Sequence, residues 1–419
     1  MRRILLIDPS ICGYGGHYLE YALSVLRQAG KQGYTCMLAV NRRFRPESVP
    51  GRYQIQVLGI FRYTFWEIYG TCPYLRDFGN RKQCSCVNAG KRMVKRLQQK
   101  IRIRQFQKDL EEFFVQVGPE PSDLLFFPTI CHLELAAFAK VLKKIQPAYA
   151  SVHLLFRRPL FQRVDGKEER NHPLVRDIRC TLLQIKNMGM ERLFFYTDTK
   201  QLQEQYNRLQ TVPFTVLPIP HTKKLHKRRY SDRICVGSLG GAREEKGFCM
   251  LPRLISQIKS TRMLYIIQTN TKETSHQMRY ALRQLQRYPK QKVVLVGELS
   301  EKEYSRYLSS IDLMLLLYDP SAYCARSSGI FVEAVTAGCA VLVTAGTWMA
   351  SQVQMFYDRY GLRIGEICSG QAEAASKLVR MERRMEQYRK DTAKAAEIYR
   401  SMHNPGKLLE KILEKELQG

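Results

Sequence analysis

Two segments decide the fold: RICVGSLGGAREEKGF (Arg233–Phe248) and YCARSSGIFVEAVTAG (Tyr323–Gly338). The first begins with a short apolar run and the second follows one, and both runs are typical of strands in a parallel sheet. Each run leads into a loop of small and polar residues. Because doubly wound folds bind ligands in the loops at the carboxyl ends of their strands, these two loops are the first candidates for a functional site.

The first loop offers two cations on a glycine-rich backbone. Arg243 and Lys246 are three residues apart and face the same way if a helical turn begins there. Two cations beside a leaving diphosphate stabilise the negative charge that grows as a glycosidic bond breaks. The alternative is an exposed loop in which these side chains pair with Glu244 and Glu245.

The second loop combines a phosphate-binding helix start with a carboxylate. Arg326, Ser327, Ser328 and Gly329 precede an apolar helix, whose first N–H groups are free to bind phosphate. Glu333, about one turn into this helix, can accept two hydrogen bonds from ribose hydroxyls. Together the two loops predict a pocket for a nucleotide-linked substrate. The alternative for Glu333 is a carboxylate that only complements the helix dipole.

Strand and helix signals alternate along almost the whole chain. The predicted strands are Ile4–Ile7, Tyr34–Val40, Ile55–Val57, Leu124–Phe127, Ala148–His153, Leu193–Thr197, Phe214–Val216, Ile234–Val236, Leu264–Gln268, Val293–Val296, Leu313–Leu317 and Val341–Val343. The predicted helices are His17–Gln28, Leu133–Lys144, Leu251–Lys259, Ser275–Gln286, Glu301–Ser309 and Ile330–Ala337. This order indicates the α/β class, with two parallel sheets that helices cover on both faces.

The length of 419 residues predicts two domains. The seam between them is Leu217–Asp232, which has two prolines and a basic cluster. We expect one domain over residues 1–217 and a second over 218–371. Residues 372–419 are rich in helix-forming residues and are predicted to form helices that pack back on the N-terminal domain.

The formal net charge of +29 predicts anionic partners: phosphorylated substrates, an anionic membrane face or nucleic acid. The twelve cysteines are scattered, and no signal peptide or long apolar span is seen. A cytosolic, reducing setting with free thiols is therefore expected. Cys72, Cys84 and Cys86 match no standard zinc spacing, so no metal site is predicted.

The segment Arg81–Lys108 contains ten Lys or Arg residues and no acidic residue. Its apolar residues at helical spacing include Met93, Val94, Leu97 and Ile101. This pattern predicts a basic amphipathic helix, which is either a solvated helix on the N-terminal domain or one that makes peripheral contact with an anionic membrane. Nucleic acid is not expected as a partner, because Phe106 is the only aromatic residue there for base stacking.

A further glycine-rich turn follows the first predicted strand. Gly13, Gly15 and Gly16 lead to His17 at the start of the first helix. Glycines let a ligand approach the backbone, and a helix start favours an anion. The spacing is not that of GxGxxG, so a dinucleotide fingerprint is not present. The alternative is a simple tight turn.

The order of these motifs resembles that of retaining glycosyltransferases of the GT-B fold, in the family-4-like group 1 that includes sucrose synthases and phosphatidylinositol mannosyltransferases. The matching segments are Gly15–Gly16, Lys246–Gly247, VVLVGELS (Val293–Ser300), SSIDLMLLL (Ser309–Leu317) and EAVTAGCAVLVT (Glu333–Thr344). The resemblance implies two Rossmann-like, doubly wound parallel-sheet domains that face a cleft. It implies an acceptor on residues 1–217 and a nucleotide sugar on residues 218–371.

The resemblance also implies roles for individual residues. The donor-binding set is Gly15, Gly16, Arg326, Ser328, Gly329 and Glu333, in which the glycine pair approaches a phosphate and the carboxylate holds the ribose. The catalytic set is Arg243, Lys246 and His153, and the acceptor-binding residue is His17. For His153 the alternative is a structural histidine at the end of a strand.

The chain departs from this family at two positions. Ser238 stands where the family has an arginine, and we expect Arg243 to replace it. Ala325 stands eight residues before Glu333, where the family has a glutamate that contacts the donor sugar. Sugar recognition is therefore expected to use other groups, such as Arg326, Ser327 or Tyr323.

We expect a cytoplasmic, hexosyl or related glycosyltransferase of polysaccharide biosynthesis, peripheral to the inner membrane face. It would move a sugar from a nucleotide sugar to a glycan, lipid-linked or small-molecule acceptor with retention of configuration. No Asp-x-Asp motif occurs at a suitable loop, so no metal or cofactor is expected. The alternatives are an inverting GT-B transferase or epimerase, and a non-catalytic binder of nucleic acid or anionic membrane lipid.

Overall fold

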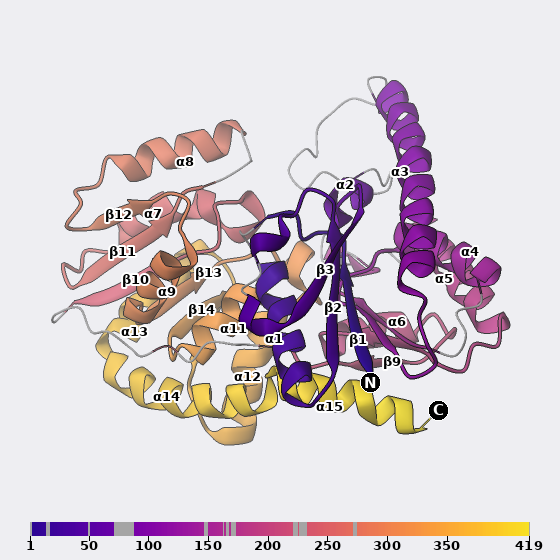
Figure 1. The fold of residues 1–419 in the computed structure, drawn as a ribbon. Coiled ribbons are helices and arrows are strands. Elements are labelled where there is room, and N and C mark those ends of the chain that lie inside the picture. Colours follow the sequence, from indigo (N-terminus) through magenta and orange to yellow (C-terminus); the bar gives the residue numbers. More distant parts are fainter. Residues whose placement is uncertain are drawn as a thin grey trace. The chain divides into compact units, whose positions relative to one another are not determined.

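The computed structural model describes residues 2–13, 17–48, 51–70, 88–145, 150–161, 163–164, 167–168, 173–220, 225, 233–270 and 275–418. Within these ranges the side chains of residues 17, 48, 52, 88–92, 163–164, 167–168, 173–174 and 416–418 are not described. The chain divides into two compact units (Figure 1). Unit 1 comprises Met1–Thr222 and Asn404–Gly419, and unit 2 comprises Lys223–His403.

Unit 1 is built on a parallel sheet of seven strands in the order β3-β2-β1-β4-β5-β8-β9. These strands are β1 (Arg3–Asp8), β2 (Thr35–Asn41), β3 (Ile55–Phe61), β4 (Leu124–Phe127), β5 (Ser151–Phe156), β8 (Leu193–Thr197) and β9 (Phe214–Val216), while β6 (Arg163–Val164) and β7 (Lys167–Glu168) form a small antiparallel pair. The helices are α1 (His17–Lys31), α2 (Phe65–Tyr69), α3 (Asn88–Val117), α4 (His132–Ile145), α5 (Pro173–Asn187), α6 (Lys200–Asn207) and α15 (Pro405–Gln418). The strand order reverses between β1 and β4, which makes their carboxyl ends the topological switch point.

Unit 2 is built on a parallel sheet of six strands in the order β12-β11-β10-β13-β14-β15. These strands are β10 (Ile234–Ser238), β11 (Met263–Gln268), β12 (Val293–Val296), β13 (Leu313–Leu316), β14 (Ala340–Thr344) and β15 (Gly365–Cys368). The helices are α7 (Leu251–Gln257), α8 (His276–Gln286), α9 (Glu301–Ser310), α10 (Pro320–Tyr323), α11 (Gly329–Thr336), α12 (Trp348–Tyr360), α13 (Gln371–Arg383) and α14 (Met385–Met402). Here the switch point lies between β10 and β13.

The predicted α/β class with two doubly wound parallel sheets is confirmed. Strands β4, β8, β9 and β12 begin and end at the predicted residues. The short strand β15 was not predicted, because only one of its four residues is buried and its sequence forms no apolar run.

The chain beyond residue 372 divides between the units. Helices α13 and α14 belong to unit 2, where α13 packs on α7 and β15 and α14 packs on α11. Helix α15 belongs to unit 1, where it lies against α1 and adds Leu408, Leu409 and Ile412 to the buried core. In the described ranges, no helix combines the length and the apolar character that crossing a bilayer requires.

Candidate functional site

The predicted basic residues of unit 2 meet at its switch point. Arg243 lies in the loop after β10, and Arg326 lies in the segment that follows β13. The Glu245 carboxylate joins them, because its Oε1 is 3.5 Å from Nη1 of Arg243 and 3.6 Å from Nη1 of Arg326. The two loops that were singled out from the sequence therefore lie side by side, as their place after neighbouring strands requires.

Lys246 is partly buried in the same cluster. Its Nζ donates a hydrogen bond to the carbonyl oxygen of Gly240 and lies 5.8 Å from the ring centroid of Tyr318. Burial, and then the positive charges of Arg243 and Arg326, lower the pKa of Lys246 to about 8. An ammonium group with this pKa is held where charge is costly, and a bound anion would relieve that cost.

The turn that positions Lys246 requires a glycine. Gly247 has a φ of 76°, in the left-handed region that side chains with a Cβ disfavour. A Cβ at this position would lie 2.3 Å from the carbonyl oxygen of Leu317. A glycine is therefore required directly after Lys246, because the chain turns there against the backbone that follows β13.

Helix α11 begins in the same cluster. The Ser328 Oγ caps it by accepting a hydrogen bond from the Phe331 N–H at 3.2 Å. The geometry of a helix leaves the N–H groups of Gly329 and Ile330 without acceptors inside the helix. The positive end of the helix dipole thus adds to the field of the nearby guanidinium groups, which favours an anion at this position.

Glu333 lies on α11 and has a partner that the sequence did not reveal. Its Oε2 accepts a hydrogen bond from the hydroxyl of Tyr304 on α9. Burial and the negative charge of Glu333 raise the pKa of Tyr304 well above its usual value, so the phenol remains a neutral donor. A carboxylate has about four acceptor sites, and a ribose would therefore share Glu333 with Tyr304.

Gln268 is a second residue of this site that the sequence reading missed. It ends β11, and its Oε1 accepts hydrogen bonds from the N–H groups of Gly240 at 2.8 Å and Gly241 at 3.4 Å. Its Nε2 donates to the carbonyl oxygen of Gly297 at 3.3 Å. A buried amide at the end of an apolar strand is the signal that would have found it, because such a group needs hydrogen-bond partners.

The predicted residues of unit 1 are described only in part. Gly15 and Gly16 lie outside the described residues, and His17 begins α1 with a side chain that is not described. Their predicted roles stay predictions. These residues and His153 belong to unit 1, whereas Arg243 and Lys246 belong to unit 2.

The prediction that His153 ends a strand is wrong. It is the third residue of β5, which continues to Phe156, because the buried apolar run extends beyond the histidine. The imidazole is fully buried, its Nδ1 lies 3.0 Å from the Tyr196 hydroxyl, and it stacks on Phe194 at 4.9 Å between ring centroids. Burial, and then Arg192 and Arg2, lower the pKa of His153 to about 3, so the ring is neutral.

The switch point of unit 1 contains two buried carboxyl groups that the sequence reading missed. Asp8 ends β1 and accepts a hydrogen bond from the Ser10 N–H at 2.9 Å, and burial raises its pKa to about 6. Glu134 stands in the first turn of α4, where burial raises its pKa to about 8 and the charge of Asp8 contributes in the same direction. Burial therefore makes both carboxyl groups harder to ionise than carboxyl groups in water.

An exposed tryptophan lies on the short helix α2. Trp66 on α2 is 40% exposed, and its Nε1 donates a hydrogen bond to the Tyr18 hydroxyl at 2.8 Å. The Arg158 guanidinium carbon stands 4.2 Å from a ring centroid of Trp66. Burial, and then the charge of Asp8, raise the pKa of the Tyr18 phenol. Tyr18 therefore lies near Asp8 at the switch point and also contacts Trp66, and we call the exposed side of Trp66 the aromatic surface.

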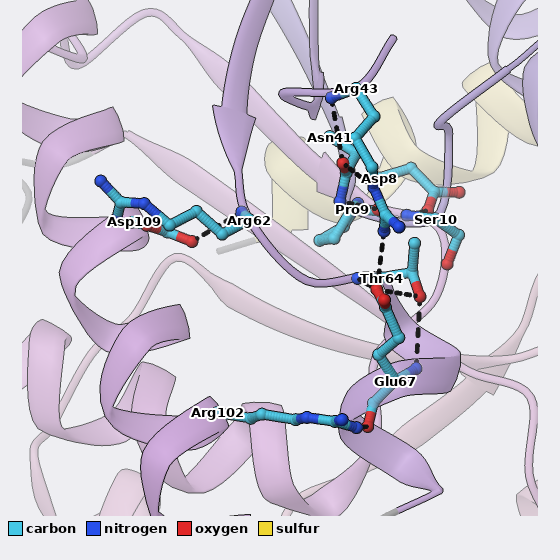
Figure 2. A network of polar contacts seen from close by, with 10 residues as sticks. All are labelled: Asp8, Pro9, Ser10, Asn41, Arg43, Arg62, Thr64, Glu67, Arg102 and Asp109. Carbon is cyan, nitrogen blue, oxygen red and sulfur yellow. Dashed lines mark hydrogen bonds and ion pairs between the residues drawn. The ribbon is translucent and has the colours of Figure 1, made fainter.

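A polar network fixes α2 against the end of β1 (Figure 2). The Asn41 amide donates to the carbonyl oxygen of Pro9 at 3.4 Å, and the Arg43 Nε donates to the Asn41 Oδ1 at 2.9 Å. The Nη2 of Arg43 then donates to the Glu67 Oε2 at 2.7 Å. Since Glu67 is the residue after Trp66, this network holds the aromatic surface in place.

The structure offers no candidate for a bound metal among the described residues, where no three His, Cys, Asp or Glu side chains come together. Cys72, Cys84 and Cys86 lie outside those residues.

Solved structures with the same architecture cover the whole chain, whereas no protein-family model and no curated protein sequence matches it. A sucrose-phosphate synthase from Thermosynechococcus elongatus is 13% identical with a TM-score of 0.62, over 100% of this chain and 98% of its own. HepE of Anabaena in complex with UDP-glucose is 12% identical with a TM-score of 0.65, over 100% of both chains. A glycosyltransferase from Rickettsia africae is 10% identical with a TM-score of 0.62, over 98% and 97%. At these identities the likeness concerns the fold alone, and the chain has the two parallel-sheet α/β domains of the GT-B fold.

Proposed function

We propose that this protein is a glycosyltransferase that moves a sugar from a nucleotide sugar to an acceptor. The observation that carries the proposal is the cluster at the switch point of unit 2, where Arg243, Lys246 and Arg326 lie near one another and Arg326 directly precedes the cap of α11. Three cations beside a helix start fit a diphosphate. Glu333, on the same helix, fits the hydroxyls of the attached ribose.

The cluster would act by stabilising the leaving group. Negative charge on the diphosphate grows as the glycosidic bond breaks, and fixed cations lower the energy of that transition state. Lys246 is the strongest candidate because burial lowers its pKa, which shows that its charge is poorly solvated and would gain from a growing negative charge nearby. With Arg243 it would supply the charge that a metal ion provides in other enzymes, so we propose a reaction without a metal.

We further propose that the sugar, a hexose or a related unit, is transferred with retention of configuration. In that mechanism the leaving phosphate oxygen takes the acceptor proton on the same face of the sugar. Because His153 is buried and neutral, we assign no proton-transfer step to it. Anomeric analysis of the product distinguishes retention from inversion, and recovery of an altered free nucleotide sugar would indicate an epimerase.

A thermal-shift screen against nucleoside diphosphates and their sugars tests the proposal directly. A ligand that binds only the folded state raises the melting temperature in proportion to the logarithm of its concentration. UDP and UDP-glucose are the first ligands to test, since both occur in the HepE structures. A rise with one nucleoside diphosphate supports the proposal, and no rise with any of them contradicts it.

The affinity for a nucleoside diphosphate is expected to fall as the pH rises above about 8. Lys246 has a lowered pKa of about 8, so its positive charge is present below this pH and is lost above it. The dissociation constant of the nucleoside diphosphate should then increase by up to about tenfold per pH unit, until the pH reaches the pKa that Lys246 has in the complex. Titration calorimetry between pH 7.5 and 9.5 measures this, because the diphosphate itself is already ionised in that range. Lys246→Arg keeps the charge and should flatten the profile, and an identical slope in this variant would exclude Lys246 as the cause.

We propose that the acceptor binds at the switch point of unit 1. Trp66 presents an exposed aromatic face on which a sugar ring can stack, and Tyr18 and Asp8 supply hydrogen-bonding groups behind it. This assignment is consistent with the predicted role of the adjacent His17, whose side chain is not described.

Trp66→Ala is expected to raise the acceptor KM by about tenfold, because it removes the stacking surface. The affinity for the nucleotide should not change, since Trp66 is not among the residues proposed to bind it. Trp66→Phe keeps an aromatic face and should retain most of the acceptor binding. Initial rates over a range of acceptor concentrations measure the effect, and an unchanged KM in the alanine variant would remove Trp66 from the acceptor site.

A further inference from the structure

Helix α3 carries an apolar stripe on its solvent side. The stripe consists of Met93, Val94, Leu97 and Ile101, whose exposed fractions are 76%, 55%, 60% and 53%. Residues 93, 97 and 101 are four apart, so they lie in line along about 12 Å of the helix. Aliphatic side chains this exposed and this close together form a contiguous patch, which marks an interaction site on the surface of a protein.

The second half of α3 buries a different face. Phe106, Leu110 and Phe113 are nearly or fully buried in unit 1. At about 100° per residue, these positions fall on roughly the opposite side of the helix from the stripe. The helix therefore has two apolar faces, of which one belongs to the core. The other face, which is the stripe, is exposed and does not contribute to the core.

The orientation of the stripe is fixed by the middle of the helix. Arg102 donates to the carbonyl oxygen of Glu67, and the buried Asp109 accepts a hydrogen bond from the Arg62 Nη1 at 2.6 Å (Figure 2). These contacts tie α3 to α2 and to the end of β3. The first turns of α3 extend past the other helices of unit 1 (Figure 1). The four side chains of the stripe are exposed there.

Exposed cations accompany the stripe. Arg96, Lys100 and Arg104 are exposed and follow one another at intervals of four residues, on the face next to Met93 and Leu97. The sequence has no acidic residue between positions 81 and 108. An aliphatic stripe bordered by cations fits the boundary between the acyl chains and the phosphate groups of a bilayer. A nucleic acid would instead require exposed aromatic side chains for stacking, which the stripe lacks.

We propose that the first half of α3 docks on an anionic lipid surface. The four stripe residues insert between the headgroups, and Arg96, Lys100 and Arg104 contact the lipid phosphates. This surface is separate from the nucleotide site of unit 2, so the proposal stands whether or not the chain is a glycosyltransferase. Arg102 belongs to the same basic segment, but it donates to the carbonyl oxygen of Glu67 and is not one of the cations that face the lipid.

Flotation of the full chain with vesicles tests this proposal. The protein should float with vesicles that contain phosphatidylserine and bind pure phosphatidylcholine vesicles at least tenfold more weakly. The variant with Met93→Gln, Val94→Gln, Leu97→Gln and Ile101→Gln should lose tenfold or more in its partition coefficient. Gln is chosen because it preserves helix propensity. A second variant with Arg96→Gln, Lys100→Gln and Arg104→Gln should lose a similar factor and most of its salt dependence.

Val115→Gln is the matched control, because Val115 is 83% exposed on the same helix but lies outside the stripe. It should float like the wild type. All variants should keep the wild-type circular dichroism and melting temperature, which shows that they are folded. The proposal is overturned if the wild type does not float with anionic vesicles or if the stripe variant floats equally well. It is also overturned if light scattering shows a dimer that only the stripe variant loses, because a second copy would then cover the stripe.

Discussion

Lys246→Ala is expected to lower turnover by about two to three orders of magnitude, the range seen when a charge-stabilising group is removed from a transition state. The reason is the position of the ammonium group, which is partly buried, and its lowered pKa, to which burial and then the charges of Arg243 and Arg326 contribute. Its electrostatic effect on a leaving diphosphate is therefore poorly screened. Turnover of the preferred nucleotide sugar, measured at saturating donor, provides the test.

The matched control is Lys290→Ala. Lys290 is exposed and precedes β12, at the opposite edge of the same sheet, so its loss should leave turnover within about twofold of the wild type. Each substitution removes one lysine, so both variants change the net charge of the chain by the same amount. Near-normal turnover in Lys246→Ala would remove this residue from the mechanism, whereas equal losses in both variants would indicate an effect of overall charge.

Glu333→Ala is expected to weaken the binding of a nucleoside diphosphate by roughly ten- to a hundredfold. Hydrogen bonds to a charged group contribute about 1.5–3 kcal/mol each, and the ribose would lose its acceptor. The measurement is the dissociation constant by titration calorimetry. The Tyr304 hydroxyl, which now donates to Glu333, also loses its partner in this variant, so stability must be measured alongside affinity.

A dideoxy nucleotide separates the ribose effect from a change in the fold. The wild type should bind the 2′,3′-dideoxy nucleoside diphosphate weakly, and Glu333→Ala should then cause little further loss, because the interaction is already absent. Tyr304→Phe serves as the second control, since it removes only the competing donor. If Glu333→Ala weakened both nucleotides by the same factor, the carboxylate would not contact the ribose.

The sequence contained most of the information about unit 2. Its strands are short apolar runs between clear helix signals, and the loops after β10 and β13 were recognisable from their composition. That Arg243 and Arg326 would meet followed from the rule that parallel strands present their carboxyl ends at one edge. The bridge through Glu245 and the bond from Tyr304 to Glu333 could not be predicted, because they depend on the packing of distant segments.

The site in unit 1 was harder to predict. Asp8 was hidden at the end of an apolar strand, and its proximity to Glu134 arises only because β1 lies beside β4, more than a hundred residues later. For α3, the sequence showed apolar residues at helical spacing. It did not show which of the two apolar faces would be buried. The aromatic residues from Phe106 onward are buried in the core, and the aliphatic stripe is exposed to solvent.

The central claim is that the switch point of unit 2 binds the diphosphate of a nucleotide sugar, and a crystal structure of the chain with such a ligand tests it most directly. We expect phosphate oxygens within hydrogen-bonding distance of the Lys246 Nζ and the Gly329 N–H, and a ribose hydroxyl within hydrogen-bonding distance of the Glu333 carboxylate. A diphosphate bound at any other place on the molecule, with these three groups unoccupied, would contradict it.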